Sequence, residues 1–272
     1  MDPADIIAPA FKGIYEYVVA AGLAFARISG VMLVMPAFTR VGVTGILRNG
    51  IALALTLPLV PLMVATVGRE NLTVGTIAAL LLKEFAVGIV VGLVLGVPLW
   101  GAEAAGAILD LQRGASFATL TDAGASEQTS VTGTLLVLAM VALYYGSGGL
   151  SVTLRALYES YGIWPITRFL PLFNSDAGAL LIGLLDDVIT MGLMLVVPIV
   201  ICLFVADIVL ALVSRAAPHF NVFALSLAVK SLVFAVLLVL YGGFLARYMA
   251  QDLATMFGST GRLETIGNVK GQ

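Results

Sequence analysis

Charged side chains are scarce in this chain of 272 residues. Asp, Glu, Lys and Arg make up 11% of it, whereas a soluble domain carries about 25%. Hydrophobic residues make up 60%, more than one globular core can hide while the fold keeps a wetted polar surface. The net charge of −2 gives no support for binding to nucleic acid. The composition therefore predicts a membrane protein, whose apolar side chains are covered by lipid or by other apolar subunits.

Cysteine and histidine occur once each, which argues against a disulfide within the chain and against a metal site. Cys202 lies in an apolar run; it cannot form a disulfide within the chain, and we expect it to pack as a small apolar side chain. His219 follows Pro218 in a short connector, with no second His, Cys or clustered carboxylate nearby to complete a metal site. A phosphate-binding glycine loop and a nucleophile–base pair are also missing. The sequence thus predicts neither an enzyme nor a cofactor.

The N-terminus lacks the basic residues of a secretory signal peptide. It reads Met-Asp-Pro-Ala-Asp, and the first apolar run is too long for the apolar core of a signal. We expect this run to be a retained membrane helix.

Six apolar blocks reach the roughly 20 residues needed to cross a bilayer. Their apolar residues are continuous rather than alternating, which is typical of helices and not of barrel strands. The blocks cover residues 17–38, 49–67, 72–100, 131–154, 179–214 and 222–250. The sequence therefore predicts an all-α, membrane-type bundle of long helical hairpins. The distribution of Lys and Arg does not settle its orientation in the membrane.

Prolines and glycines interrupt these blocks. Proline removes a backbone hydrogen bond and kinks a helix, and membrane helices tolerate it where neighbours satisfy the freed groups; the prolines concerned are Pro36, Pro58, Pro61, Pro98 and Pro198. Gly88, Gly92 and Gly96 recur at every fourth residue and so share one helical face. Such a stripe allows a second helix to approach closely, either from this chain or from another one.

Ionisable residues inside or at the ends of the apolar blocks are the sharpest functional signal. Each would cost about 2.5–3.5 kcal/mol at the bilayer centre on insertion scales, so they should face protein, water or each other. They are Arg27, Lys83, Glu84, Glu103, Asp110, Asp186, Asp187, Asp207 and Lys230. Structural pairing within a bundle and a proton or ion relay both explain them. We favour pairing, because the acids are scattered over several blocks.

One charge pair follows from the register of a helical hairpin. Asp207 lies 11 residues before Pro218 and Lys230 lies 12 residues after it. In an antiparallel hairpin that turns near Pro218, both residues reach a similar depth, and we predict that they pair.

Several segments match one known family in order and spacing. They are Arg27 with Met35-Pro36-Ala37-Phe38, Lys83-Glu84-Phe85 with Gly88, residues 106–121, Ser160-Tyr161-Gly162-Ile163-Trp164-Pro165, Leu185-Asp186-Asp187, residues 211–218, Asn221-Val222-Phe223 and Val229-Lys230-Ser231. Through them the chain resembles the T subunit of the type III secretion export apparatus (the SctT class), which is related to the flagellar export protein FliR. The family often has proline where this chain has Ala123 and Ala228, and an aliphatic residue where it has Phe220.

The resemblance implies a non-enzymatic subunit of a pore for unfolded secreted proteins in the bacterial inner membrane, raised toward the periplasm. Residues of about 15–155 would form a part like the R-class subunit, residues of about 178–250 a hairpin like the S-class subunit, and 251–272 a polar tail. The implied partners are R- and S-class gate subunits, an autocleaving U-class switch subunit and a V-class export-gate protein. Nucleic acid is not among them.

The resemblance also implies a role for the polar segment 111–128, which matches the loop that plugs the closed pore. Small and hydroxylated side chains suit a movable loop, and two large apolar ones offer bulk to block passage; the residues concerned are Gly114, Ser116, Phe117, Leu120, Thr121 and Asp122. From the residues alone, we favour an ordinary connector for this segment.

A stand-alone, proton-coupled secondary transporter is the alternative function. Transporters usually contain internal repeats with paired broken helices, and we find no residue-level repeat between the two halves of this sequence. The number of copies in an assembly and the proteins exported do not follow from the sequence.

Overall fold

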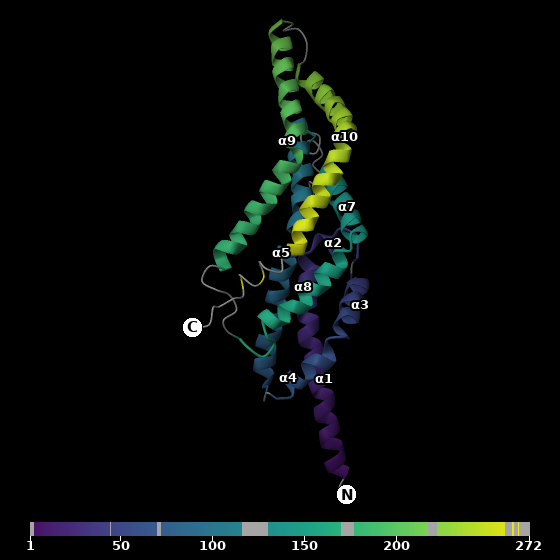
Figure 1. The fold of residues 1–272 in the computed structure, drawn as a ribbon, viewed down its shortest axis with the longest axis vertical. Helices are drawn as coiled ribbons and strands as arrows, with labels where there is room; N and C mark the ends of the chain where they lie inside the picture. Colours follow the sequence, from purple (N-terminus) through teal and green to yellow (C-terminus); the bar gives the residue numbers. More distant parts are fainter. Residues whose placement is uncertain are drawn as a thin grey trace. The chain divides into compact units, whose positions relative to one another are not determined.

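A computed structural model describes residues 3–43, 45–69, 72–115, 130–169, 177–216 and 222–258, together with Leu263 and Ile266. Every regular element in these ranges is helical (Figure 1), which confirms the predicted all-α class. The helices are α1 (Pro3–Val34), α2 (Pro36–Thr39), α3 (Gly45–Thr56), α4 (Val60–Val67), α5 (Val74–Arg113), α7 (Val131–Gly146), α8 (Gly149–Ile163), α9 (Ala177–Ala216) and α10 (Val222–Thr255), followed by a 3-10 turn (Met256–Gly258).

The chain divides into two compact units. The first contains Met1–Gly96, Leu150–Ile182 and Gly258–Gln272, and the second contains Val97–Gly149 and Gly183–Phe257. The division falls inside α5, next to Pro98, which remains within that helix.

Four helices are long and apolar enough to cross a membrane, and up to six spans result if each bent helix pair counts as one. The second apolar block is such a pair, since α3 and α4 meet at 69° around Pro58. Pro61 falls in the first turn of α4, where its missing N–H costs no helical hydrogen bond. Proline does not break a helix at every position in this chain. Pro98 stays inside α5 and Pro198 stays inside α9.

The fourth apolar block is also broken. Helix α7 ends at Gly146 and α8 begins at Gly149, and Gly148 between them has φ +81°, a conformation that glycine adopts without strain. Helix α8 then continues to Ile163, beyond the end of the block at residue 154.

The first unit is built around a close crossing of α1 and α5. A β-carbon added at Gly88 would overlap the carbonyl oxygen of Arg27, and one added at Gly92 would lie 3.0 Å from the carbonyl oxygen of Val31. From the other side, a β-carbon at Gly30 would overlap the carbonyl oxygen of Phe85. At Gly88 and Gly92, the helix that packs on the glycine stripe is therefore α1 of the same chain. Both glycines allow the backbones of α1 and α5 to come close together.

The second unit repeats this device at positions that the sequence analysis missed. Gly106 of α5 faces the backbone of Gly133 at the start of α7, with no room for a β-carbon. Gly101 of α5 meets Gly192 of α9, where a β-carbon on Gly192 would lie 2.9 Å from the carbonyl oxygen of Gly101. Helix α5 therefore binds neighbouring helices through small residues in this unit too.

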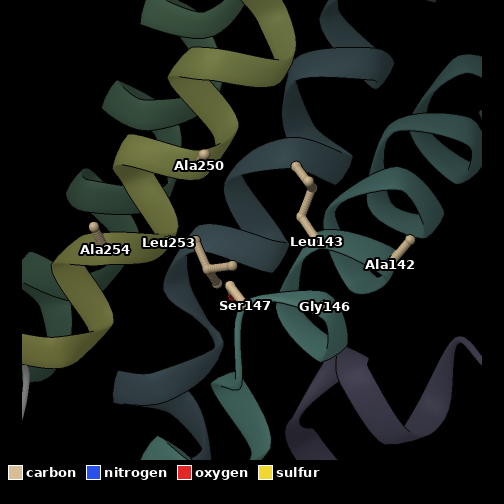
Figure 2. Close-up of a pocket in the computed structure, with 7 residues that line it drawn as sticks. All are labelled: Ala142, Leu143, Gly146, Ser147, Ala250, Leu253 and Ala254. Carbon is tan, nitrogen blue, oxygen red and sulfur yellow. The ribbon is translucent and has the colours of Figure 1, made fainter.

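Helix α7 also contacts α10 in the second unit. A cavity of about 310 Å³ lies between the ends of the two helices, lined by Ala142, Leu143, Gly146, Ser147, Ala250, Leu253 and Ala254. Leu253 of α10 and Ser147 both line it (Figure 2). The Ser147 hydroxyl donates to the carbonyl oxygen of Tyr144, so the cavity offers apolar surface and no reactive group.

Helices α9 and α10 leave most of their apolar surface uncovered within the chain. In the most apolar part of α10 only 6% of the residues are buried, against 50% in α1 and in α5. Cys202 is exposed on α9, contrary to the expected packing in a core. Asp186 is exposed as well, because it lies on the outer face of α9, where its neighbour Leu185 is also 65% exposed. Because the chain itself does not cover this face, burial of Asp186 by a partner stays a prediction.

We predict that Gly88→Ala lowers stability by about 1–3 kcal/mol, because the added methyl overlaps the Arg27 carbonyl and forces α1 away from α5. The temperature at which the full chain loses protease resistance in isolated membranes measures this. Gly75→Ala, in the same helix but with nothing within 4 Å of its β-carbon, is the matched control. Equal behaviour of the two variants would contradict the close crossing.

Candidate functional site

Arg27 of α1 lies at the centre of a fully buried network in the first unit. Its Nε donates to Glu84 Oε2 of α5 at 2.6 Å. Its two terminal nitrogens donate to Ser160 Oγ of α8 at 2.9 Å and to the carbonyl oxygen of Trp164 at 2.7 Å. The guanidinium lies over the ring of Tyr161, 3.8 Å from its centroid. One side chain therefore joins α1, α5 and the end of α8.

Lys83 extends the network along α5. Its Nζ lies 2.5 Å from Glu84 Oε1 and donates to the carbonyl oxygens of Pro165 and Ile166 at 2.8 and 3.0 Å. Two cations thus share one carboxylate, and backbone carbonyls just beyond the C-terminal end of α8 supply the remaining negative potential. Cations are favoured at this end of a helix.

The glycine crossing and the ion network depend on each other. Gly30 follows Arg27 by three residues and Gly88 follows Glu84 by four, so each glycine lies one turn along its helix from a charged partner. Close backbone approach brings Arg27 within reach of Glu84, and pairing offsets the desolvation that this approach imposes on the two charges. An arginine holds its donors in a rigid plane, so Arg27 meets Glu84, Ser160 and the Trp164 carbonyl in fixed directions, which the compact ammonium of a lysine would not reproduce.

Asp110 of α5 forms a second polar centre, in the second unit. Its Oδ1 accepts from the hydroxyl of Thr132 at 2.5 Å and from Arg113 Nε at 3.0 Å. Its Oδ2 accepts from the Ser130 hydroxyl at 2.6 Å and from the backbone N–H of Thr132 at 3.0 Å. Ser130 in turn caps α7, because its Oγ accepts from the N–H of Gly133. Asp110 therefore fastens the end of α5 to the start of α7.

The two helix ends held by Asp110 are the two ends of the predicted plug loop. Helix α5 ends at Arg113, and Gly114 has φ +81°, the left-handed conformation that often terminates a helix. The predicted plug residues Ser116, Phe117, Leu120, Thr121 and Asp122 lie outside the described residues. The structure thus gives the base of this loop, whose proposed role is treated below.

The charge pair predicted between the last two long helices is present. Lys230 Nζ of α10 lies 2.9 Å from Asp207 Oδ1 of α9, and the same nitrogen donates to the carbonyl oxygen of Gln112 at 2.9 Å. The side chain of Asp207 is 38% exposed, so the pair contributes no more than about 1 kcal/mol. Lys230 therefore contacts α5 at the residue directly before Arg113. The guanidinium of Arg113 in turn lies over the ring of Phe234 of α10.

The nine predicted charges therefore separate into groups. Arg27, Lys83, Glu84 and Asp110 are buried, and each has its partners within the chain. A second group, half-buried, consists of Glu103, Asp187, Asp207 and Lys230. Six of the nine charges form close ion pairs: Arg27 and Lys83 with Glu84, Asp110 with Arg113, and Lys230 with Asp207.

Sequence reasoning missed the uncharged partners of this site. Ser130 carried a recognisable signal, since a serine directly before an apolar helix is a typical N-cap. Ser160 and the carbonyl oxygens after Ile163 carried none, because a buried hydroxyl and a backbone oxygen have no pattern in sequence. Among the described residues, no group of three His, Cys, Asp or Glu side chains is placed to hold a metal ion; His219 lies outside them.

We predict that Glu84→Gln destabilises the chain by about 3–5 kcal/mol, because it leaves Arg27 and Lys83 buried without a counter-charge. Protease resistance in isolated membranes against temperature measures the loss. Glu159→Gln, the same change at an exposed position of α8, is the control. A stability for Glu84→Gln close to that of the control would show that carbonyl oxygens alone can hold both cations.

Comparison with known proteins matches these features to one family. The model of bacterial export proteins, family 1, matches residues 18–256. Yop proteins translocation protein T of Yersinia pestis is 34% identical over 216 residues, 79% of this chain and 82% of the relative. Secretion system apparatus protein SsaT of Salmonella typhimurium is 29% identical, covering 87% and 92%. Flagellar biosynthetic protein FliR of Caulobacter vibrioides is 28% identical, covering 79% and 84%. The match contains both polar centres and all four long apolar helices, and the chain belongs to the bacterial export proteins, family 1.

Proposed function

We propose that this chain is a non-enzymatic structural subunit of a type III secretion export gate, where it forms part of an inner-membrane pore for unfolded proteins. The observation that carries the proposal is the uncovered hairpin of α9 and α10. Its large apolar side chains face outward on both helices, including Ile208 at 61%, Leu232 at 67% and Val239 at 82% exposure.

Lipid and neighbouring subunits are the two possible covers for such a surface. Family membership favours subunits, because relatives of this chain are named for secretion and flagellar assembly. We assign the hairpin, residues 178–250, to the part that resembles an S-class subunit, and residues 15–155 to the part that resembles an R-class subunit. R- and S-class subunits are then the direct partners, with the U- and V-class export proteins docked nearby, and the assembled gate is raised toward the periplasm.

The polar networks support a structural role over proton transfer. Glu84 and Asp110 each face a positively charged side chain and several hydrogen-bond donors. A carboxylate whose oxygens face cations and hydrogen-bond donors in this way holds neighbouring helices together, which is a structural role. A proton-coupled transporter remains the competing function, and purification separates the two.

We expect the full chain to co-purify stoichiometrically with co-expressed R- and S-class subunits and to aggregate when it is extracted from the membrane without them. Val239→Trp should abolish co-purification, because extra apolar bulk fits lipid but not a packed subunit interface. Val239→Ile is the control at the same position. A stable, homogeneous chain without partners would instead support the transporter.

The segment between α5 and α7 is proposed as the plug of the closed pore. Asp110 accepts hydrogen bonds from Arg113 on one side of this segment and from Ser130 and Thr132 on the other. It thereby holds the end of α5 and the start of α7 together, which gives a plug a fixed support.

Removal of residues 114–125 should therefore raise ion leakage through the assembled gate, measured as conductance in planar bilayers. Asp110→Ala should raise it less, since the loop remains but its base is released. Arg155→Gln, at an exposed position of α8, is the control. An unchanged leak in the deletion variant would reject the plug.

A further inference from the structure

Two neighbouring cavities of the first unit lie along the contact between α1 and α3, helices that pack side by side (Figure 1). The larger, of about 500 Å³, is lined by Ala21, Gly22, Phe25, Ile46, Asn49, Gly50 and Leu53. The smaller, of about 250 Å³, is lined by Ser29, Met32, Leu33, Arg48, Asn49, Ala52 and Phe85. Both are lined in part by Asn49, so the two cavities adjoin at this residue, and together they are called the groove below.

The two parts of the groove differ in chemistry. Apart from Asn49, the larger cavity is lined only by apolar or glycine residues, and its volume lies within the range of roughly 300–1,000 Å³ that is usual for small-ligand pockets. The smaller cavity contains a cationic guanidinium, that of Arg48, and a hydroxyl, that of Ser29. The groove therefore has an apolar end and a polar, positively charged end.

The polar groups at the charged end lack partners within the described part of the chain. Arg48 is half-buried there and forms no ion pair with any described residue, and Ser29 Oγ is buried without a hydrogen bond. A buried hydroxyl without a partner is unfavourable, so a ligand that accepts a hydrogen bond from it would be bound more tightly. Helix α3 has no acidic residue in its first turn, so none of its first-turn side chains would repel an anion beside Arg48.

We propose that this groove binds an anionic phospholipid, with one acyl chain in the larger cavity and the phosphate at Arg48 and Ser29. Arginine is well suited to phosphate, which it can meet with two parallel hydrogen bonds. No acidic side chain lines either cavity, so the ammonium group of a zwitterionic lipid would find no counter-charge. The bilayer around the membrane helices supplies the ligand.

Photo-crosslinking tests this on the full chain, synthesised cell-free into phosphatidylcholine vesicles that contain a trace of lipid with a photoreactive acyl chain. The probe is either phosphatidylglycerol or phosphatidylcholine. We expect phosphatidylglycerol to label residues 21–33 and 46–53, and phosphatidylcholine to label them far less. Arg48→Gln should reduce labelling by phosphatidylglycerol about tenfold, since a charge-assisted hydrogen bond is lost. Ser29→Ala should reduce it by a smaller factor.

A second variant fills the groove instead of removing its charge. A β-carbon at Gly50 meets nothing within 4 Å, so Gly50→Leu should fold normally and block labelling by both probes. Gly183→Leu, at an equally open position of α9, and Arg155→Gln are the matched controls and should label like the unaltered chain. Circular dichroism on each variant verifies that its helices form.

Three results would overturn the proposal. Equal labelling by the two probes would remove the preference for an anionic lipid, and full labelling of Arg48→Gln would remove the phosphate site. Loss of labelling when R- and S-class subunits are synthesised in the same vesicles, with a cysteine at position 49 then cross-linking to one of them, would assign the groove to protein. These results leave the proposed gate function untouched, because that function is tested by co-purification.

Discussion

The first unit of this protein depends on the pairing of Glu84 with Arg27 and Lys83. All three side chains are almost completely buried, and charges removed from water are tolerated only with close partners and satisfied hydrogen bonds. The glycines at the crossing of α1 and α5 make that closeness possible. Packing and electrostatics therefore impose one geometry: larger residues at the crossing would separate the charges, and unpaired charges would oppose the crossing.

Asp110 plays a comparable part in the second unit at a helix connection rather than a helix crossing. Its carboxylate takes hydrogen bonds from both sides of the segment that follows α5, including the capping serine of α7. The carboxylate thereby fixes the end of α5 against the start of α7.

The apolar hairpin of α9 and α10 needs a cover from outside the chain. With so few residues buried in α10, the hairpin cannot derive its stability from this chain alone, and the energy must come from lipid or from other subunits. Hydropathy alone describes every apolar block as a membrane span. The degree of burial distinguishes α1 and α5, which are half covered by their own chain, from a hairpin that needs an external cover.

The sequence alone determined the all-α class, the membrane environment, the family and the register of the Asp207–Lys230 pair. These properties depend on composition, on periodicity and on spacing along one hairpin, all of which are local. Only the tertiary structure decided which helix faces the glycine stripe, that α8 supplies Ser160 and its terminal carbonyl oxygens to Arg27, and that Asp186 is exposed. Such contacts join residues as many as 137 positions apart. Their partners include backbone oxygens, which every residue carries, so no sequence pattern identifies them.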